Sequence, residues 1–280
     1  RRQRQMCIRD SYHTAPNGTK PASYFHGPDC CTASGHRIIS MLPTFMYAER
    51  GKEFFVNQYL PSHYIGKDFA FQISGNYPEA ENMELTVLSE KAVDRVLNLR
   101  IPSWCKAPRV SVNGKNVIGV KPGTYLKISR KWSKGDKVSI VFPMEERWVM
   151  REHHSKYTTY TLPRGEIMYK EEPTDRIPYA FLRGPMVYCL DMVWNKQLCN
   201  DDVDLAKDIR LNVSVKPSVV DKPYANMVGP VYRTKALYKG SEVEVLLTPF
   251  VDIGQWFRPS GQKPEKNAEM FTYGIWLYKE

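Results

Sequence analysis

An alternation of apolar and polar residues with a period of two constrains the fold of this chain most, and it begins shortly after Glu53. The apolar members are Phe69, Phe71 and Ile73, then Leu85 and Val87, then Leu97, Leu99 and Ile101. Successive side chains of a β-strand point to opposite faces, so this period is typical of strands with one face buried. Short strands repeated about every 8 to 12 residues predict a β-sandwich.

Turn residues join further strands in the same region. Asn113-Gly114 follows an apolar pair of strand residues and tolerates the positive φ of a tight primed turn, so it predicts a hairpin. A second turn, Lys134-Gly135-Asp136, connects strands expected at 125–128 and 138–142. We therefore predict one β-sandwich domain over residues 51–150.

The pattern loosens between residues 145 and 175, and we place a domain junction there. A second β-sandwich domain is predicted over 151–280. Its strands are expected at 179–182, 186–191, 211–215, 243–247 and 270–278. The acidic stretch 201–208 is expected to be an exposed connection or a short helix.

One segment has a helical period instead. Its apolar residues follow the i, i+3, i+4, i+7 spacing of one buried face and are Ile38, Ile39, Leu42, Phe45 and Met46. Thr32 or Ser34 can cap the start, Gly51 is the expected stop, and Pro43 is expected to kink the helix or to shorten it.

The amino-terminal end and the net charge exclude several classes of protein. We interpret residues 1–11 as a leader foreign to the fold, because they are basic and have no period. No run of about 18 apolar residues exists, so no membrane span is expected. The net charge is +10, but basic residues alternate with acidic ones, and nucleic acid is not an expected partner. Localisation is not encoded at this end, and a periplasmic or extracellular site is favoured over a cytoplasmic one.

Six cysteines are present, and two of them stand out by position. Cys30 and Cys31 lie together at the predicted start of the helix. Free N–H groups and the positive end of the helix dipole favour a thiolate there, and a thiolate is both a nucleophile and a zinc ligand. Buried, inert thiols are the alternative for this pair. Cys105 and Cys189 are expected to act as small hydrophobic residues within or beside strands, and Cys199 has no assigned role.

Other candidates for chemistry are weaker. The histidines and the nearby aspartate lack the spacing of metal ligands, and they are His26, Asp29, His36, His63, His153 and His154. Carboxylates that could flank a glycosidic bond lie in polar junctions, where solvated side chains are expected, and they are Glu145, Glu146, Glu171, Glu172, Asp201, Asp202 and Asp204.

Several short segments together resemble a known family. They are Gly27-Pro28-Asp29-Cys30-Cys31-Thr32-Ala33-Ser34-Gly35-His36-Arg37, Met46-Tyr47-Ala48, Phe55-Val56-Asn57-Gln58-Tyr59, Leu99-Arg100-Ile101-Pro102-Ser103-Trp104-Cys105, Val112-Asn113-Gly114, Trp132 with Gly135-Asp136, Phe142-Pro143-Met144 and Arg183-Gly184-Pro185-Met186-Val187-Tyr188-Cys189. With these the chain resembles the β-L-arabinofuranosidase-like proteins of glycoside hydrolase family 127. The resemblance runs from about Tyr12 to the end.

The resemblance implies a fold class. Members of the family join an amino-terminal (α/α)6 barrel of helical hairpins, which holds the catalytic site, to β-sandwich domains. The chain is then expected to be mainly β and to be a carboxy-terminal fragment. Residues 12–50 would be the last loop and helix of the barrel, ahead of the two β-sandwich domains.

The resemblance also implies a mechanism. The family is a set of retaining glycoside hydrolases in which a zinc-bound cysteine attacks the anomeric carbon. Cys30 matches the catalytic nucleophile, and Cys30 with Cys31 matches two of the zinc ligands. The glutamate that acts as general acid, the other zinc ligands and most sugar contacts would belong to the absent barrel. The parent protein is then expected to be an enzyme that acts on β-L-arabinofuranosides or related plant-type sugars, and the 280-residue chain is expected to be inactive alone.

Two departures and two alternatives accompany this interpretation. The family often has proline where this chain has Thr32, and substrates vary between subgroups, so the exact sugar stays open. Cys7 lies in the leader and is not assigned as a missing ligand. The alternatives are a non-catalytic β-sandwich module that binds carbohydrate or buttresses a helical domain, and a purely structural zinc anchor. A module of the first kind could bind sugar through exposed aromatics, namely Trp194, Tyr224, Trp256 and Phe257. The carbohydrate substrate is the expected partner, and a homodimer is left open.

Overall fold

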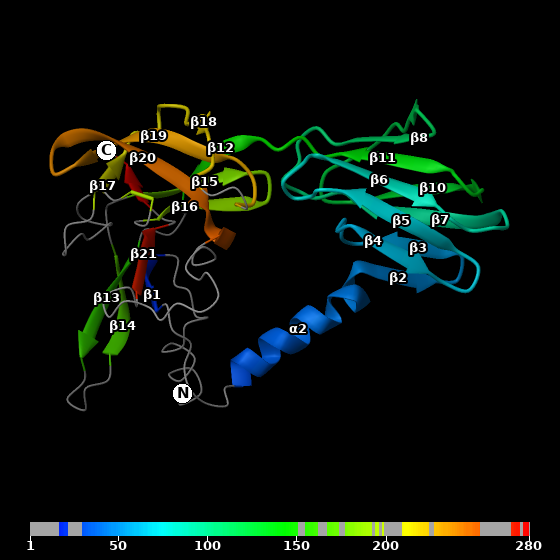
Figure 1. Cartoon of the computed structure of the whole chain (residues 1–280), viewed down its shortest axis with the longest axis horizontal. Coiled ribbons are helices and arrows are strands. Elements are labelled where there is room, and N and C mark those ends of the chain that lie inside the picture. Colours follow the sequence, from blue (N-terminus) through cyan, green and yellow to red (C-terminus); the bar gives the residue numbers. More distant parts are fainter. Residues whose placement is uncertain are drawn as a thin grey trace. The chain divides into compact units, whose positions relative to one another are not determined.

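The chain folds as two compact units in the computed structural model (Figure 1). The structure describes residues 17–21, 30–150, 155–161, 167–173, 177–191, 194–195, 198, 209–223, 227–252, 270–274 and 277–279, and for 17–21, 30–36, 155–161, 167–173, 270–274 and 278–279 it describes the backbone alone. The central unit is His26–Glu145. The terminal unit combines Arg1–Phe25 with Glu146–Glu280.

The strands of the central unit form two sheets. The four-stranded sheet has the order β10 (Tyr125–Trp132), β7 (Val93–Arg100), β3 (Glu53–Val56) and β2 (Tyr47–Arg50). The six-stranded sheet has the order β4 (Ser62–Ile65), β5 (Ala70–Gly75), β6 (Asn82–Val87), β11 (Lys137–Val141), β8 (Arg109–Val112) and β9 (Lys115–Asn116). Neighbours are antiparallel except β3 and β7, which are parallel.

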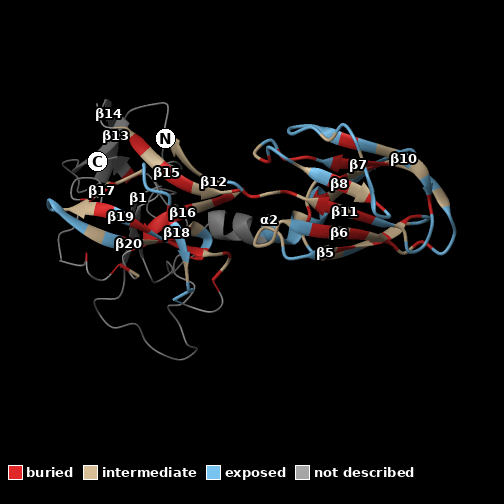
Figure 2. Cartoon of the chain, turned by 90° about the horizontal axis from the view of Figure 1, so that it is seen from above, coloured by how far each residue is buried: buried red, intermediate tan, exposed pale blue. Residues whose placement is uncertain are grey.

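Both sheets contribute to a single apolar core, so the predicted β-sandwich is present. The alternating residues of β5 and β7 that were expected to be buried are buried, among them Phe71, Ile73, Leu97 and Leu99 (Figure 2). Trp132, at the end of β10, is fully buried, and its indole N–H donates to a backbone carbonyl at 3.2 Å. Each large side chain buried in this way contributes about 1.5–3 kcal/mol.

The predicted hairpin at Asn113-Gly114 is confirmed. Asn113 has φ 50° and Gly114 has φ 79°, the left-handed conformations that a tight primed turn requires. Val112 pairs with Lys115 across the turn.

Helix α2 (Cys30–Met46) begins at Cys30, so Thr32 and Ser34 lie inside the helix and the expectation that one of them caps its start was wrong. The helix ends five residues before Gly51. The residues after Met46 form β2, which pairs with β3 across a turn in which Gly51 has φ 59°. The predicted stop at Gly51 was therefore wrong, because strand pairing takes residues 47–50 out of the helix. Asn57 satisfies two carbonyls at the helix end, its backbone N–H donating to Met46 O at 2.8 Å and its Nδ2 to Phe45 O at 3.2 Å.

The apolar stripe of α2 is mostly exposed. Met46 is buried, but Ile38, Ile39 and Phe45 are half or more exposed, and Pro43 lies inside the helix. The spacing was correctly assigned to a helix, whereas burial of the whole stripe was not observed. The helical period identifies an apolar face, but it does not specify what covers that face.

The terminal unit contains one large sheet and one hairpin. The large sheet has the order β1 (Asn17–Pro21), β21 (Met270–Gly274), β16 (Met186–Asp191), β20 (Ser241–Pro249), β19 (Val231–Tyr238), β17 (Ile209–Leu211), β22 (Leu277–Lys279), β15 (Pro178–Arg183) and β12 (Glu146–Met150), with β18 (Ser218–Val220) on β19. β15 also pairs with β16, which closes six of these strands into a ring. The hairpin is β13 (Ser155–Thr161) with β14 (Ile167–Pro173), and a 3-10 turn, η2 (Phe250–Asp252), follows β20.

The strands of this unit also enclose one core. Its largest members are aromatic, and Phe181, Tyr188 and Tyr232 lie with ring centroids 4.9–5.4 Å apart in edge-on arrangements. Residues 17–21, expected in a barrel remnant, form a strand of this sheet.

The mainly β fold class is confirmed. Strands in β12, β13, β14 and β19 were not predicted, and the strand expected at 211–215 occupies Ile209–Leu211. Within the described ranges α2 is the single α-helix, so the helical-hairpin barrel is not visible there. No described helix has the length and apolar character needed to cross a membrane. The leader and the stretch 201–208 lie outside the described residues.

Candidate functional site

The predicted catalytic pair occupies the first two positions of α2. The helix begins at Cys30, and its first turn contains no acidic residue. The backbone of Cys30 and Cys31 is described, and their side chains lie outside the described part of the structure. The backbone N–H groups of this first turn have no carbonyl partner within the helix, and the helix dipole is positive at this end. The position therefore suits a negatively charged group.

The other candidate cysteines and histidines divide into three groups. Cys105 and Cys189 are fully buried and free, as predicted for small hydrophobic residues. Burial raises the pKa of both thiols, so they stay protonated at neutral pH. His63 lies exposed within β4. The remaining candidates are outside the residues whose side chains are described, and they are Cys7, His26, Asp29, His36, His153, His154 and Cys199.

The three proposed carboxylates and aromatics whose side chains the structure describes do not assemble a site. Glu145 is exposed and forms an ion pair with Lys106, while Glu146 accepts a hydrogen bond from the Tyr232 hydroxyl at 2.7 Å. Trp194 is half-buried with a buried Nε1, so it is not an open platform for a sugar ring. The other proposed residues have side chains outside the description, and they are Glu171, Glu172, Asp201, Asp202, Asp204, Tyr224, Trp256 and Phe257. Among described side chains, no three His, Cys, Asp or Glu residues come together to hold a metal ion.

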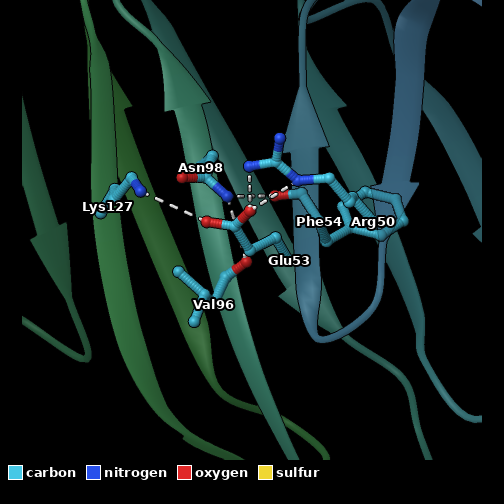
Figure 3. A network of polar contacts seen from close by, with 6 residues as sticks. All are labelled: Arg50, Glu53, Phe54, Val96, Asn98 and Lys127. Atoms are coloured by element: carbon cyan, nitrogen blue, oxygen red, sulfur yellow. Dashed lines mark hydrogen bonds and ion pairs between the residues drawn. The ribbon is translucent and has the colours of Figure 1, made fainter.

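A charged network on the four-stranded sheet is structural (Figure 3). Glu53 accepts two hydrogen bonds from Arg50, at 3.1 and 2.5 Å, and one from Lys127 at 3.2 Å. These bonds, that from Arg50 first, lower the pKa of Glu53, which keeps its carboxylate ionised at neutral pH. Asn98 lies beside them, fully buried, and its Nδ2 donates to the carbonyls of Phe54 and Val96. Because Glu53 is ionised and paired with cations, the network supplies no general acid.

A small pocket lies in the central unit where β3 and β7 end. It has a volume of about 220 Å³ and is lined by Asn57, Gln58, Tyr59, Leu60, Tyr77, Arg100 and Pro102. Five of these seven residues come from two segments that carried the family resemblance, 55–59 and 99–105, to which sequence reasoning assigned no chemistry, and Leu60 and Tyr77 lie outside those segments. Their signal in the sequence is a pair of polar residues directly after a buried strand, Asn57-Gln58 after β3.

The comparison with protein families matches residues 53–144 to the model described as "Beta-L-arabinofuranosidase, GH127 middle domain". This match lies within the central unit. A curated relative, the non-reducing end β-L-arabinofuranosidase of Bifidobacterium longum subsp. longum, is 26% identical over 189 residues, which cover 62% of this chain and 26% of the relative. The resemblance to glycoside hydrolase family 127 is thereby confirmed.

Solved structures share the fold. A GH127 β-L-arabinofuranosidase from Geobacillus stearothermophilus T6 aligns with a TM-score of 0.62 at 22% identity, covering 96% of this chain and 39% of that one. A second GH127 β-arabinofuranosidase aligns with a TM-score of 0.64 at 24% identity, covering 92% and 40%. The chain therefore spans about a quarter of the curated relative and about two fifths of these structures.

Proposed function

We propose that this chain is part of a retaining glycoside hydrolase that acts on β-L-arabinofuranosides or related plant-type sugars, with the Cys30 thiolate as nucleophile. The observation that supports the proposal most is the position of Cys30 at the start of α2, 23 residues before the start of the GH127 middle-domain match (53 − 30 = 23). The relatives that match are described as β-L-arabinofuranosidases. A helix start favours the ionised form of a thiol, and the thiolate is the nucleophilic form.

The donor chemistry of this segment fits zinc. Zinc is bound in proteins by thiolate, imidazole and carboxylate ligands, usually four in number. Cys30 and Cys31 would supply two of these, and the remaining ligands would come from parts of the parent protein beyond this chain. When bound, zinc would keep the coordinating thiol deprotonated at neutral pH.

The chemistry assigned to Cys30 is a double displacement. Its Sγ would attack the anomeric carbon while the bond from that carbon to the leaving oxygen breaks, and the leaving oxygen would take a proton from a general acid outside this chain. Water would then attack the same carbon and give its proton to the conjugate base of that general acid, while the carbon–sulfur bond would break and the thiolate would be restored. Two inversions give net retention of configuration.

Turnover of an aryl β-L-arabinofuranoside tests the proposal. The 280-residue chain should show no turnover, because in this proposal it supplies only two of the zinc ligands and the general acid belongs to the rest of the parent protein. A version of the protein extended to the length of its relatives should be active, and Cys30→Ser should abolish that activity. Cys7→Ser, which removes a thiol that has no role in the proposal, is the control and should retain activity. Full turnover in Cys30→Ser would instead support a purely structural zinc anchor.

A non-catalytic role has one observation in its favour. The exposed apolar residues of α2 suit a segment that packs against another helical element, as in a module that buttresses a catalytic domain. Titration of the chain with arabino-oligosaccharides separates a binding module from a scaffold. Binding by the isolated chain would favour the module, and no binding would favour the scaffold.

A further inference from the structure

We propose that the pocket at the ends of β3 and β7 binds a sugar acid, meaning a single sugar ring that carries a carboxylate. The pocket lies wholly within the central unit and uses none of the residues assigned to catalysis. The inference therefore goes beyond the proposed function and does not depend on it.

The charge of the pocket points to an anion. Arg100 is the one charged residue among those that line it. The Arg100 side chain is exposed and forms no ion pair with any described residue, whereas most other arginines of this unit with assigned contacts bind a carboxylate, as Arg95 does with Asp68. A guanidinium presents parallel N–H donors that match the two oxygens of a carboxylate. An occupant with one carboxylate would supply the missing negative charge.

The remaining lining groups suit a hydroxylated ring. The Gln58 amide makes no hydrogen bond to a described residue, so it has both a donor and an acceptor to offer. Tyr77 is half-buried, and its hydroxyl forms a hydrogen bond with the side chain of Trp104. Planar amides bind sugar hydroxyls, and the partly exposed Tyr77 ring offers an apolar surface to the C–H groups of a sugar. At about 220 Å³ the pocket is smaller than the ~300–1,000 Å³ of drug-sized sites, which limits it to one ring.

Hydrogen bonds within the protein fix the walls of the pocket without a ligand. The Tyr59 hydroxyl donates to the Arg100 carbonyl at 2.8 Å, which ties the end of β7 to the segment after β3. Asn57 accepts a hydrogen bond from the Tyr125 hydroxyl at 2.6 Å and donates to the end of α2. Fixed walls reduce the entropy lost on binding, which favours affinity.

Both tyrosines also stay neutral, and since the Tyr59 hydroxyl already donates to the Arg100 carbonyl, Tyr77 is the tyrosine that can face a ligand. Burial raises the pKa of Tyr59 and of Tyr77, and the positive charge of Arg100 opposes that increase in both. At neutral pH the pocket therefore combines one cation with neutral hydrogen-bonding groups.

Isothermal titration calorimetry of the 280-residue chain at pH 7 and low salt tests this proposal with three probes: D-galacturonate, D-galactose and acetate. Galacturonate should bind with a Kd on the order of 1 mM, and galactose and acetate each at least about tenfold more weakly. Arg100→Gln should weaken galacturonate binding at least roughly tenfold. Arg109→Gln removes the same charge from an exposed position on β8 outside the pocket and should leave binding unchanged.

Each contrary result overturns a defined part of the proposal. Equal affinity for acetate would show that any carboxylate fits, including one on a protein side chain. It would refute the claim that the pocket recognises a sugar ring. Equal affinity for galactose would remove the requirement for an anion. No heat with galacturonate at ten times the expected Kd, or equal weakening by Arg100→Gln and Arg109→Gln, would show that the pocket is not a site.

Discussion

The side chain of Asp136 links two turns of the central unit, and replacing it should destabilise that unit measurably. Its Oδ1 accepts a hydrogen bond from Asn113 Nδ2 at 2.7 Å, and its Oδ2 accepts one from the backbone N–H of Ser133 at 2.8 Å and one from Arg130 at 3.2 Å. The Asn113 side chain in turn accepts from the backbone N–H of Lys137 at 2.8 Å. The β8–β9 turn and the β10–β11 turn are therefore connected through one carboxylate.

The magnitude follows from these three bonds. A net hydrogen bond contributes about 0.5–1.5 kcal/mol, and the Arg130 pair is discounted because it is partly exposed to solvent. Asp136→Ala should therefore lower the free energy of unfolding of the central unit by about 2 kcal/mol. Asp136→Asn keeps an acceptor but loses the charge, so it should cost about half as much.

Hydrogen exchange read by mass spectrometry is the appropriate assay, because it reports each unit separately. Peptides from β10 and β11 should exchange faster in Asp136→Ala at every urea concentration, while peptides from β19 and β20 should be unchanged. A loss below about 0.5 kcal/mol, within the range of an ordinary surface substitution, would refute the account of this turn.

Acid should remove the same stabilisation. Burial acts to raise the pKa of Asp136, but the hydrogen bonds from Ser133 and Asn113 and the charge of Arg130 outweigh it, and the net pKa is lowered. The stabilisation is then fully present above the unfolded pKa of about 3.9 and is lost as the pH falls through the lower folded value. The difference in free energy of unfolding between wild type and Asp136→Ala should therefore shrink below about pH 4. Urea titrations of both proteins at a series of pH values would measure this difference.

Three further predictions concern other parts of the chain. Tyr232→Phe should lower the free energy of unfolding of the terminal unit by about 1–2 kcal/mol in a urea titration, since the hydroxyl donates to a half-buried carboxylate at 2.7 Å; no change would mean that water replaces the bond. Cys105 and Cys189 should resist alkylation by iodoacetamide at pH 8 in the native protein and react after unfolding, as followed by peptide mass spectrometry, because burial raises the pKa of both thiols. Ile39→Lys should reduce the fluorescence of a bound hydrophobic dye more than Ile118→Lys does, because Ile39 belongs to the exposed apolar stripe of α2 and Ile118 is an isolated exposed residue; equal reductions would contradict a stripe that acts as one patch.

The β-sandwich of the central unit could be predicted because its strands bury one face, and apolar and polar residues therefore alternate in their sequences. Phe71 and Ile73 show this, as does the turn at Asn113-Gly114, whose positive φ values few residues tolerate. The end of α2 could not be predicted in this way. Tyr47 continues the apolar pattern, and its place in β2 depends on pairing with Val56, a tertiary contact.

The terminal unit was harder to predict for a related reason. Strands such as β13 and β14 are rich in polar residues and have no alternating apolar pattern, so only their pairing with each other defines them. In the candidate site, the helix itself was anticipated from its apolar spacing, but it begins at Cys30, ahead of Thr32 and Ser34, which were the expected caps. The pocket at Arg100 was not, because Gln58, Tyr77 and Arg100 are brought together by the sheets and are distant in sequence.

The central claim, that Cys30 is a nucleophile, is tested most directly by mass spectrometry of the protein extended to the length of its relatives. The reaction with an aryl β-L-arabinofuranoside would be stopped in acid during turnover, and the peptide that contains Cys30 and Cys31 would be fragmented. The account predicts an added mass of one pentosyl group on the sulfur of Cys30 in the wild type and none in Cys30→Ser. A pentosyl group on any other residue, or steady turnover by Cys30→Ser, would contradict it.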